Sequence, residues 1–314
     1  MPSLSYIIKE PLPRELRLDR FVSEYLRLLS RSQIKARNLK ASINGKEAKL
    51  SRHVKQGNLL ELLWEDSPPQ DIIPQNIPLD IIYEDERCVV VNKPQGLVVH
   101  PGAGNRQGTL VNALCYRKLQ SDGLFQSGGV AGTGARPGIV HRLDKDTSGV
   151  IIAAWDEEAQ AFLCEQFKSR KVKKTYAAIV RGVPKEKNGR IETFIARDPK
   201  DRKRFTVCER GKAALTFYKV VKSHQNYSLL LLRPRTGRTH QLRVHLRHIG
   251  HPILGDPLYG VFDKNFPDAA LMLHSRDLAI TLIGEKEERI FSSPIPDRFH
   301  ALMEKLDASG TAHE

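Results

Sequence analysis

The pattern of apolar and polar positions divides the chain into a short N-terminal region and a longer second region. In the first region, apolar residues recur with helical spacing from Leu16 to about Leu28, which predicts a helix. Ser30 is followed three residues later by Gln33, a capping-box pattern that predicts a second short helix over residues 31–39. The N-terminal region is therefore expected to begin with two helical segments.

Apolar runs and turn dipeptides predict strands in both regions. Residues 41–43 lead into the tight-turn dipeptide Asn44-Gly45, and residues 59–64 form a further strand pattern. In the second region, we expect strands at 81–83, 88–92, 150–154, 175–180, 213–221 and 227–233, and helices at 108–119, 156–170 and from about 239. Residues 197–210 are basic and lack periodicity, so we expect a loop there.

A proline-rich stretch separates the two regions. Four prolines lie among polar residues between positions 65 and 78, which predicts an extended, semi-rigid connection rather than a packed element. We therefore expect a leader over residues 1–13, a small domain over 14–66, a linker over 67–78, a large domain over 79–303 and a tail over 304–314.

The charge of the chain narrows the choice of partners. The 314 residues carry a formal net charge of +14 at pH 7, which favours nucleic acid or an anionic membrane surface. No apolar run reaches the ~18 residues of a membrane-spanning helix, and no basic helix with a bulky apolar face stands out, so nucleic acid is favoured. The four cysteines are widely spaced and form no CxxC pair, which argues against a zinc site or a disulfide framework and predicts a cytoplasmic protein.

The basic residues are most one-sided between positions 27 and 55. This stretch holds nine Lys or Arg and one acidic residue, Glu47, whereas a solvated face normally mixes both signs. A phosphate-contacting surface is the preferred interpretation, and a merely soluble basic face is the alternative. The candidate RNA contacts here are Arg31, Lys35, Arg37 and Lys46.

Residues 138–149, Gly-Ile-Val-His-Arg-Leu-Asp-Lys-Asp-Thr-Ser-Gly, form a polar cluster directly before the buried strand pattern at 150–154. The rim of a buried strand can hold a catalytic side chain rigidly. The alternative is a solvated turn in which Asp and Thr bond the local backbone.

A second polar block runs from Arg233 to Arg247, and no acidic residue occurs from Arg233 to Gly255. Read as a helix from about residue 239, it places His240, Arg243 and Arg247 opposite an apolar face. The histidines spaced by three resemble metal ligands, but no Cys or carboxylate lies nearby and the arginines would repel a cation. A cationic helix directed at a phosphate or a catalytic carboxylate fits better.

Two families are recognisable in these blocks. Residues 15–65 resemble the S4 RNA-binding domain through Arg17-Leu18-Asp19-Arg20-Phe21, Ser30-Arg31-Ser32-Gln33-Ile34, Ile43-Asn44-Gly45-Lys46 and Val54-Lys55-Gln56-Gly57-Asn58. Residues 78–300 resemble the RluA family of pseudouridine synthases through five blocks, namely 92–96 (NKPQG), 141–149 (HRLDKDTSG), 174–176 (KTY), 236–245 (TGRTHQLRVH) and 250–256 (GHPILGD).

The resemblance implies both a fold and a substrate. The fold is α+β, with a small S4 RNA-binding domain followed by a catalytic domain with a mixed, mostly antiparallel sheet. With an S4 module in front, the chain is similar to the bacterial RluD class, which modifies large-subunit ribosomal RNA. The family also suggests a monomer.

The resemblance also assigns roles to individual residues. Asp144 matches the catalytic aspartate, Tyr176 the tyrosine against the target base, and Arg243 the basic residue that pairs with the aspartate. Leu273 is expected as an aliphatic wall under the base. A target base in structured RNA must be extruded, and our hypothesis is that Arg142, beside Asp144, fills the vacated stack. Lys171 and Lys173, in a basic run before a predicted strand, are candidate RNA contacts.

The chemistry of this isomerisation agrees with the motifs. Moving uracil from N1 to C5 of the same ribose is redox-neutral, which agrees with the absence of nucleotide, flavin or metal motifs, so no cofactor is expected. Cleavage at the sugar calls for a carboxylate, and the sequence leaves open whether Asp144 attacks C1′ or removes a sugar proton. Two rivals remain, a non-catalytic RNA-binding ribosome-assembly factor and a base-excising hydrolase that would release free uracil.

Overall fold

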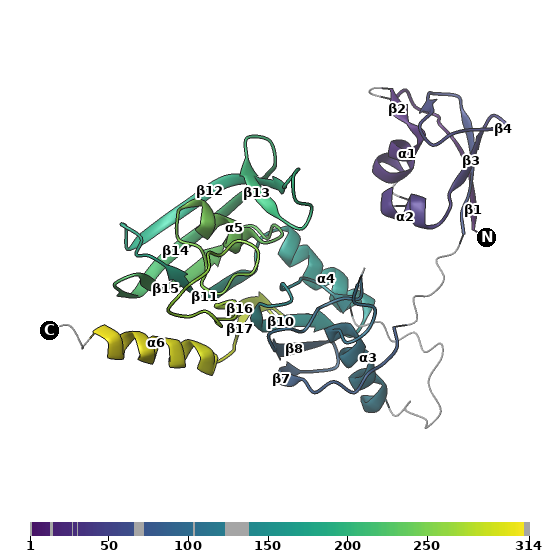
Figure 1. Cartoon of the computed structure of the whole chain (residues 1–314). Coiled ribbons are helices and arrows are strands. Elements are labelled where there is room, and N and C mark those ends of the chain that lie inside the picture. The colour runs from purple at the N-terminus through teal and green to yellow at the C-terminus, as the bar shows by residue number, and fades with distance from the viewer. Residues whose placement is uncertain are drawn as a thin grey trace. The chain divides into compact units, whose positions relative to one another are not determined.

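The computed structural model describes residues 2–12, 15–26, 28–29, 31–65, 72–102, 104–122 and 138–310. It divides the chain into two compact units, Met1–Asp71 and Ile72–Glu314 (Figure 1). No helix within the described ranges is long and apolar enough to cross a membrane.

The N-terminal unit combines short helical segments with a four-stranded sheet. Its elements in chain order are β1 (Ser3–Ile7), β2 (Leu16–Arg17), α1 (Leu18–Arg20), the π-helical turn η1 (Phe21–Tyr25), α2 (Arg31–Ala36), β3 (Lys40–Ile43), β4 (Lys46–Glu47), β5 (His53–Val54) and β6 (Leu59–Leu63). The sheet order is β1-β6-β3-β4. Asn44 and Gly45 both have positive φ, as the two-residue turn between β3 and β4 requires. The predicted helix, helix and hairpin order is confirmed, although both helices are shorter than expected.

The prediction of a leader over residues 1–13 is wrong, because β1 is a strand of the N-terminal sheet. All five of its residues pair antiparallel with β6, from Ser3 opposite Leu63 to Ile7 opposite Leu59. The strand lies at the sheet edge and alternates exposed with half-buried residues, so its apolar signal is weak.

The second unit is built on an eleven-stranded sheet within the described residues. Its strands are β7 (Asp80–Glu84), β8 (Cys88–Lys93), β9 (Gly138–Ile139), β10 (Ser148–Ala154), β11 (Lys173–Arg181), β12 (Asn188–Arg197), β13 (Phe205–Cys208), β14 (Lys212–His224), β15 (Tyr227–Pro234), β16 (Leu273–Thr281) and β17 (Glu288–Ser292). Nine of them run in the order β13-β12-β14-β15-β11-β16-β10-β8-β7, with β17 beside β16 and β9 beside β10. Among the described residues of this sheet, the β10–β16 pair is parallel and the other strand pairs are antiparallel, so the expected mixed, mostly antiparallel sheet is confirmed.

Helices cover both faces of this sheet. They are α3 (Leu110–Ser121), α4 (Glu157–Lys168), α5 (Gln241–His248) and α6 (Asp297–Gly310). Alternate residues of β10 face opposite sides, since Ile151 packs in the core that α3, α5 and α6 share, while Ile152 packs in the core that includes α4. The central strands are therefore buried on both faces. The polar loop before β10 is thus attached directly to a rigid, buried strand.

Three further boundaries differ from the predictions. Residues 72–78 belong to the second unit, where the Asn112 amide donates to Ile73 O and the Gln75 N–H donates to Asn112 O, while residues 67–71 of the expected linker lie outside the described residues. The expected loop at 197–210 contains β13, which pairs with β12. Finally, α6 continues to Gly310, so the tail expected from 304 is largely helical.

Candidate active site

A cavity of about 500 Å³ opens in the second unit and gathers the predicted catalytic-domain residues. Arg142, Asp144, Tyr176, Arg243 and Leu273 all line it, although they are spread over more than 130 positions of the chain. They come from the loop before β10, from β11, from α5 and from the start of β16. The volume lies within the range of ~300–1,000 Å³ that is usual for ligand pockets.

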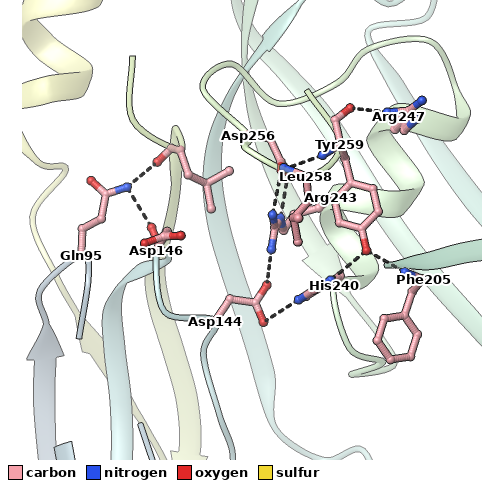
Figure 2. Close-up of polar contacts among 11 residues, drawn as sticks. Gln95, Asp144, Asp146, Phe205, His240, Arg243, Arg247, Asp256, Leu258 and Tyr259 are labelled. Carbon is pink, nitrogen blue, oxygen red and sulfur yellow. Dashed lines mark hydrogen bonds and ion pairs between the residues drawn. The ribbon is translucent and has the colours of Figure 1, made fainter. Parts of the chain in front are cut away.

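Asp144 and Arg243 form an ion pair in this cavity. Arg243 Nη1 donates to Asp144 Oδ2 at 3.2 Å, while its Nε and Nη2 donate to the two carboxylate oxygens of Asp256 at 2.8 and 2.7 Å (Figure 2). The Arg243 side chain is 5% exposed and the Asp144 side chain 19% exposed. Arg243 is thus held by one buried carboxylate and presents its remaining nitrogen to another that solvent and ligand can reach.

The Arg243–Asp256 pair keeps both partners charged. Burial opposes ionisation of each group, but their mutual hydrogen bonds and charges outweigh it, raising the pKa of Arg243 and lowering the pKa of Asp256. The backbone N–H groups of Leu258 and Tyr259 also donate to Asp256 Oδ1, both at 2.9 Å. A permanent cation therefore stands 3.2 Å from Asp144 Oδ2 and orients this side chain through a charge-assisted hydrogen bond.

His240 faces the other oxygen of Asp144. Its Nε2 lies 3.8 Å from Asp144 Oδ1, and its Nδ1 lies 2.8 Å from the hydroxyl of Tyr259 (Figure 2). That hydroxyl accepts the Phe205 N–H at 2.8 Å, so its own proton is available to His240 Nδ1. Burial is the main cause that lowers the pKa of His240. In the tautomer whose Nδ1 accepts from the Tyr259 hydroxyl, the ring proton is on Nε2, the nitrogen that faces Asp144.

The backbone at His240 is strained. Its φ is 55°, in the left-handed region that a residue with a Cβ adopts at a cost, and it lies directly before the first residue of α5. Strain of this kind is typical of functional sites.

Side chains from the end of β8 and from the loop after it hold the Asp144 loop in place. The ammonium group of Lys93, which is fully buried, donates to the carbonyls of Pro94, Leu97 and Lys145 at 2.8, 2.8 and 3.0 Å. The Gln95 amide donates to Asp146 O at 2.9 Å (Figure 2). Burial lowers the pKa of Lys93 to about 8, against the opposing charges of Asp146 and Asp144. Residues 145 and 146, directly after Asp144, are therefore fixed by their backbones.

Gly149 allows the Asp144 loop to enter the sheet. Gly149 pairs with Ser275 in the parallel β10–β16 ladder, and its φ is +110°. A Cβ at this position would lie 2.1 Å from the Ser275 carbonyl oxygen. Glycine is thus required for the close approach of β10, which follows the Asp144 loop, to β16, which begins with Leu273.

Tyr176 and Leu273 form the apolar part of the cavity. Both are buried, and they come from the paired strands β11 and β16. Burial raises the pKa of Tyr176 to about 12, with the Asp144 charge acting in the same direction and a hydrogen bond with Ser275 opposing it. A neutral aromatic ring beside an aliphatic side chain suits a flat, uncharged nucleobase.

Several cations line the cavity. Arg142, Lys168 and Arg170 are exposed and Lys174 is half-buried, and all four line it. Lys171 is exposed without lining the cavity, and Lys173 forms an exposed ion pair with Glu288 at 2.9 Å. The basic run after α4 therefore contributes to the site mainly through Lys168, Arg170 and Lys174 rather than through the two lysines singled out in the sequence.

The basic residues predicted in the N-terminal unit belong to that separate unit. Lys35 and Lys46 are exposed, Arg37 is half-buried, and Arg31 begins α2. They are not among the residues of the cavity.

Several residues of the site were not singled out from the sequence. Asp256 could have been noticed in the sequence, because it is the first carboxylate after residues 233–255, which contain no acidic residue. Lys93 could also have been noticed, because it is a cation that follows the apolar run Val89-Val90-Val91 after a single asparagine. Tyr259 left no signal, since a single tyrosine in an irregular segment gives no hint of its partner.

The histidine series in and after α5 has other partners. His245 lies within 2.9 Å of Thr216 Oγ1 and 3.0 Å of Thr193 Oγ1, and His251 lies 3.0 Å from the Arg181 carbonyl oxygen. Within the described residues, no group of three His, Cys, Asp or Glu is arranged to hold a metal ion.

Comparisons with known proteins point in one direction. The family model described as RNA pseudouridylate synthase matches residues 87–248. The chain is 45% identical over 291 residues to a ribosomal large subunit pseudouridine synthase D from Borreliella burgdorferi, covering 90% of this chain and 87% of that protein. It is 47% identical to an uncharacterized RNA pseudouridine synthase from Aquifex aeolicus, covering 82% and 81%. Among solved structures, human RNA pseudouridylate synthase domain containing 1 matches with a TM-score of 0.57 and 28% identity, over 74% of this chain and 96% of that one.

Proposed function

The chain belongs to the RNA pseudouridylate synthase family, and from this premise we propose that it converts specific uridines of large-subunit ribosomal RNA to pseudouridine. The family fixes the reaction class, which is an isomerisation of uridine within RNA. The choice of RNA rests on relatives from Borreliella burgdorferi and Pasteurella multocida that carry the name ribosomal large subunit pseudouridine synthase D. The carrying observation in the structure is the accessible Asp144 carboxylate beside the buried Arg243.

Asp144 acts at the ribose in this proposal. The reaction breaks the N1–C1′ bond, rotates the uracil and forms the C5–C1′ bond. C5 then loses its proton and N1 gains one, so the product is an isomer of the substrate. The Arg243 guanidinium occupies Oδ2 of Asp144, which leaves Oδ1 directed at the cavity and at His240. Oδ1 is therefore the oxygen that either attacks C1′ or takes a proton from the sugar.

The remaining cavity residues position the base. Tyr176 and Leu273 enclose the uracil ring, and Arg142 fills the stack from which the base has been withdrawn. Extrusion of a base from structured RNA costs on the order of a few kcal/mol. The cations that line the cavity offset this cost by binding the phosphates of the RNA. His240 donates from Nε2 to Asp144 or to the ribose.

The N-terminal unit is an S4-like RNA-binding module in this proposal. Its support is the order of two helical segments and a hairpin, together with the exposed Lys35 and Lys46. Arg31 and Arg37 complete the proposed contacts. These residues increase the affinity for RNA without touching the reacting uridine.

The decisive experiment measures tritium release from C5-labelled uridine in ribosomal RNA. Wild-type protein is expected to release tritium without free uracil, and Asp144→Ala is expected to lose at least ~10⁴-fold in rate. Asp146→Asn is the matched control, since this carboxylate lies two residues away and does not line the cavity. It is expected to stay within about tenfold of wild type.

Other outcomes would select a rival. Free uracil would identify a base-excising hydrolase. Tight RNA binding with no tritium release from naked RNA or from pre-ribosomes would identify a non-catalytic assembly factor. Equal losses in Asp144→Ala and Asp146→Asn would favour a mechanism with two carboxylates.

A further inference from the structure

A second cavity lies next to the active site. It encloses about 350 Å³ between the end of β12, the start of β13 and the start of β14. Gly237, Arg238 and Thr239 line both this cavity and the active-site cavity, so a single stretch of backbone separates the two. A strand that leaves one cavity over this stretch enters the other.

The dividing stretch is firmly held. The side-chain oxygen of Gln241 accepts the Arg238 N–H at 3.0 Å and the Thr236 hydroxyl at 2.7 Å. Arg238 Nε donates to the Ala213 carbonyl at 3.0 Å, which leaves the two terminal nitrogens of its guanidinium for a ligand. The second cavity therefore has a preformed wall.

The lining of the second cavity suits a nucleotide. Its charged residues, among those that the structure describes, are Arg197, Lys212 and Arg238, and no carboxylate from the same part of the chain lines it. Phe205 supplies an aromatic surface, with the Arg197 guanidinium 5.0 Å from its ring centroid. Unpaired RNA bases stack on aromatic side chains and on guanidinium planes, while lysine and arginine bind the phosphate.

The wall of the second cavity is also bonded to the active site. The Phe205 N–H donates to the Tyr259 hydroxyl, and that hydroxyl lies 2.8 Å from His240, which faces Asp144 (Figure 2). The position of Phe205 relative to the reacting carboxylate is thus fixed by two hydrogen bonds. A base stacked on Phe205 would be held at a defined distance from the target uridine.

We propose that the second cavity binds the nucleotide adjacent to the target uridine in the same RNA strand, with its base on Phe205 and its phosphate on Lys212 and Arg238. The inference rests on the proposed RNA substrate and extends it, because it makes an unstacked neighbouring nucleotide part of substrate recognition. The enzyme then selects a target by two adjacent extruded positions rather than by one.

The test is a double-mutant cycle between Phe205 and the neighbouring base. Short RNAs carry the labelled target uridine with an abasic site at the 5′ neighbour, at the 3′ neighbour or at neither. Phe205→Leu removes the aromatic ring and keeps the backbone N–H that bonds Tyr259. For each pair, both the single-turnover rate of tritium release and the Kd of the Asp144→Ala background are measured.

We expect one of the two abasic RNAs to lose about tenfold in affinity with the wild-type Phe205. Phe205→Leu should lose about as much affinity for the intact RNA. The same variant should show no further loss of affinity when the intact RNA is replaced by that abasic RNA. Lys212→Ala, an exposed change that leaves the fold intact, should weaken the intact RNA and become neutral when the neighbouring phosphate is replaced by an uncharged methylphosphonate. Lys219→Ala is the matched control, because it removes the same charge from the same strand and lines neither cavity.

The outcomes separate this site from the proposed function. Coupled losses in Kd without tritium release would keep the second site and overturn the isomerase. Tritium release with additive losses, or with no loss for either abasic RNA, would overturn the second site and keep the isomerase. A loss in Lys219→Ala as large as in Lys212→Ala would also overturn the second site, since it would reflect overall charge alone.

Discussion

The loop of residues 142–147 and the basic stretch of residues 27–55 are both polar, but their charged side chains are held differently. In the loop, the backbone carbonyls of Lys145 and Asp146 are held by Lys93 and Gln95, and Asp144 is paired with the buried Arg243. In the basic stretch, Lys35 and Lys46 extend into solvent. Chemistry at a single atom requires the first arrangement, whereas attraction of a polyanion requires only the second. Substitutions should therefore have large, salt-independent effects in the loop and graded, salt-dependent effects in the basic stretch.

The largest effect on stability is expected from Arg243→Ala. It leaves Asp256 as an unpaired buried carboxylate, which should lower the free energy of unfolding by about 3–5 kcal/mol. It also removes the cation beside Asp144, so tritium release per folded molecule should fall by about 10³-fold. Urea unfolding and single-turnover release measure the two parts, and added salt should restore neither.

Arg243→Lys is the control for this prediction. It keeps the positive charge but cannot bond both oxygens of Asp256 while reaching Asp144. An intermediate loss would support the geometric role of the guanidinium. Activity of Arg243→Ala within tenfold of wild type would contradict the contrast between the two regions.

Gly149→Ala should have the next largest effect. The new Cβ would meet the Ser275 carbonyl at 2.1 Å and would sit on a backbone with φ of +110°, so the β10–β16 pairing must open. We expect a loss of about 3 kcal/mol or more in the free energy of unfolding. Gly96→Ala separates the steric clash of the new Cβ from the strain of a positive φ. The φ of Gly96 is +86°, but nothing lies within 4 Å of the new Cβ. It should cost about 1–2 kcal/mol, and equal losses in both variants would mean that backbone strain alone decides.

The stability of the fold at acidic pH should depend on His141, which lies directly before the loop. Its Nε2 accepts the Ile152 N–H at 3.1 Å, and burial, aided by the Lys174 charge, lowers its pKa to about 3. A histidine whose pKa is lower in the folded state than in the unfolded state stabilises the fold fully above pH ~6.5 and loses this contribution as the pH falls toward 3. The wild type should therefore lose about 2 kcal/mol between pH 7 and pH 5 relative to His141→Gln. Unfolding curves at both pH values test this, and a constant difference between the two proteins would contradict it.

The sequence predicted the parts of the site that lie next to one another in the chain. Residues 150–154 were recognisable as a strand because all of them are apolar, and the helix pattern from about residue 239 placed Arg243 on its polar face. The pairing of Asp144 with Arg243 followed from the family resemblance and not from any local pattern.

What could not be predicted depends on contacts between distant segments. The β10–β16 ladder joins residues more than 120 positions apart, and no local periodicity announces it. His240 was placed on the polar helix face, but its bond to Tyr259 depends on how the irregular segment after α5 folds back. Strand β1 was missed because an edge strand with one half-buried face lacks a strong apolar signal.

The smallest effect is expected in the basic stretch, from the double substitution Lys35→Ala and Lys46→Ala. Both side chains are exposed, so the fold should be unaffected and the Kd for ribosomal RNA should rise only about fivefold at moderate salt. The slope of log Kd against log salt should decrease by about two, one for each lost phosphate contact. Tritium release at saturating RNA should change little, because neither lysine belongs to the unit that holds Asp144.

The control for this prediction removes Lys185 and Lys286, which changes the net charge equally from exposed positions of the second unit. This pair should leave the slope unchanged. If both double substitutions change the slope of log Kd against log salt equally, the RNA is attracted by the overall charge of +14. The basic stretch then makes no specific contribution to binding. If only the Lys35 and Lys46 pair changes the slope, the N-terminal unit contacts the RNA directly, and binding and chemistry lie in separate units of the chain.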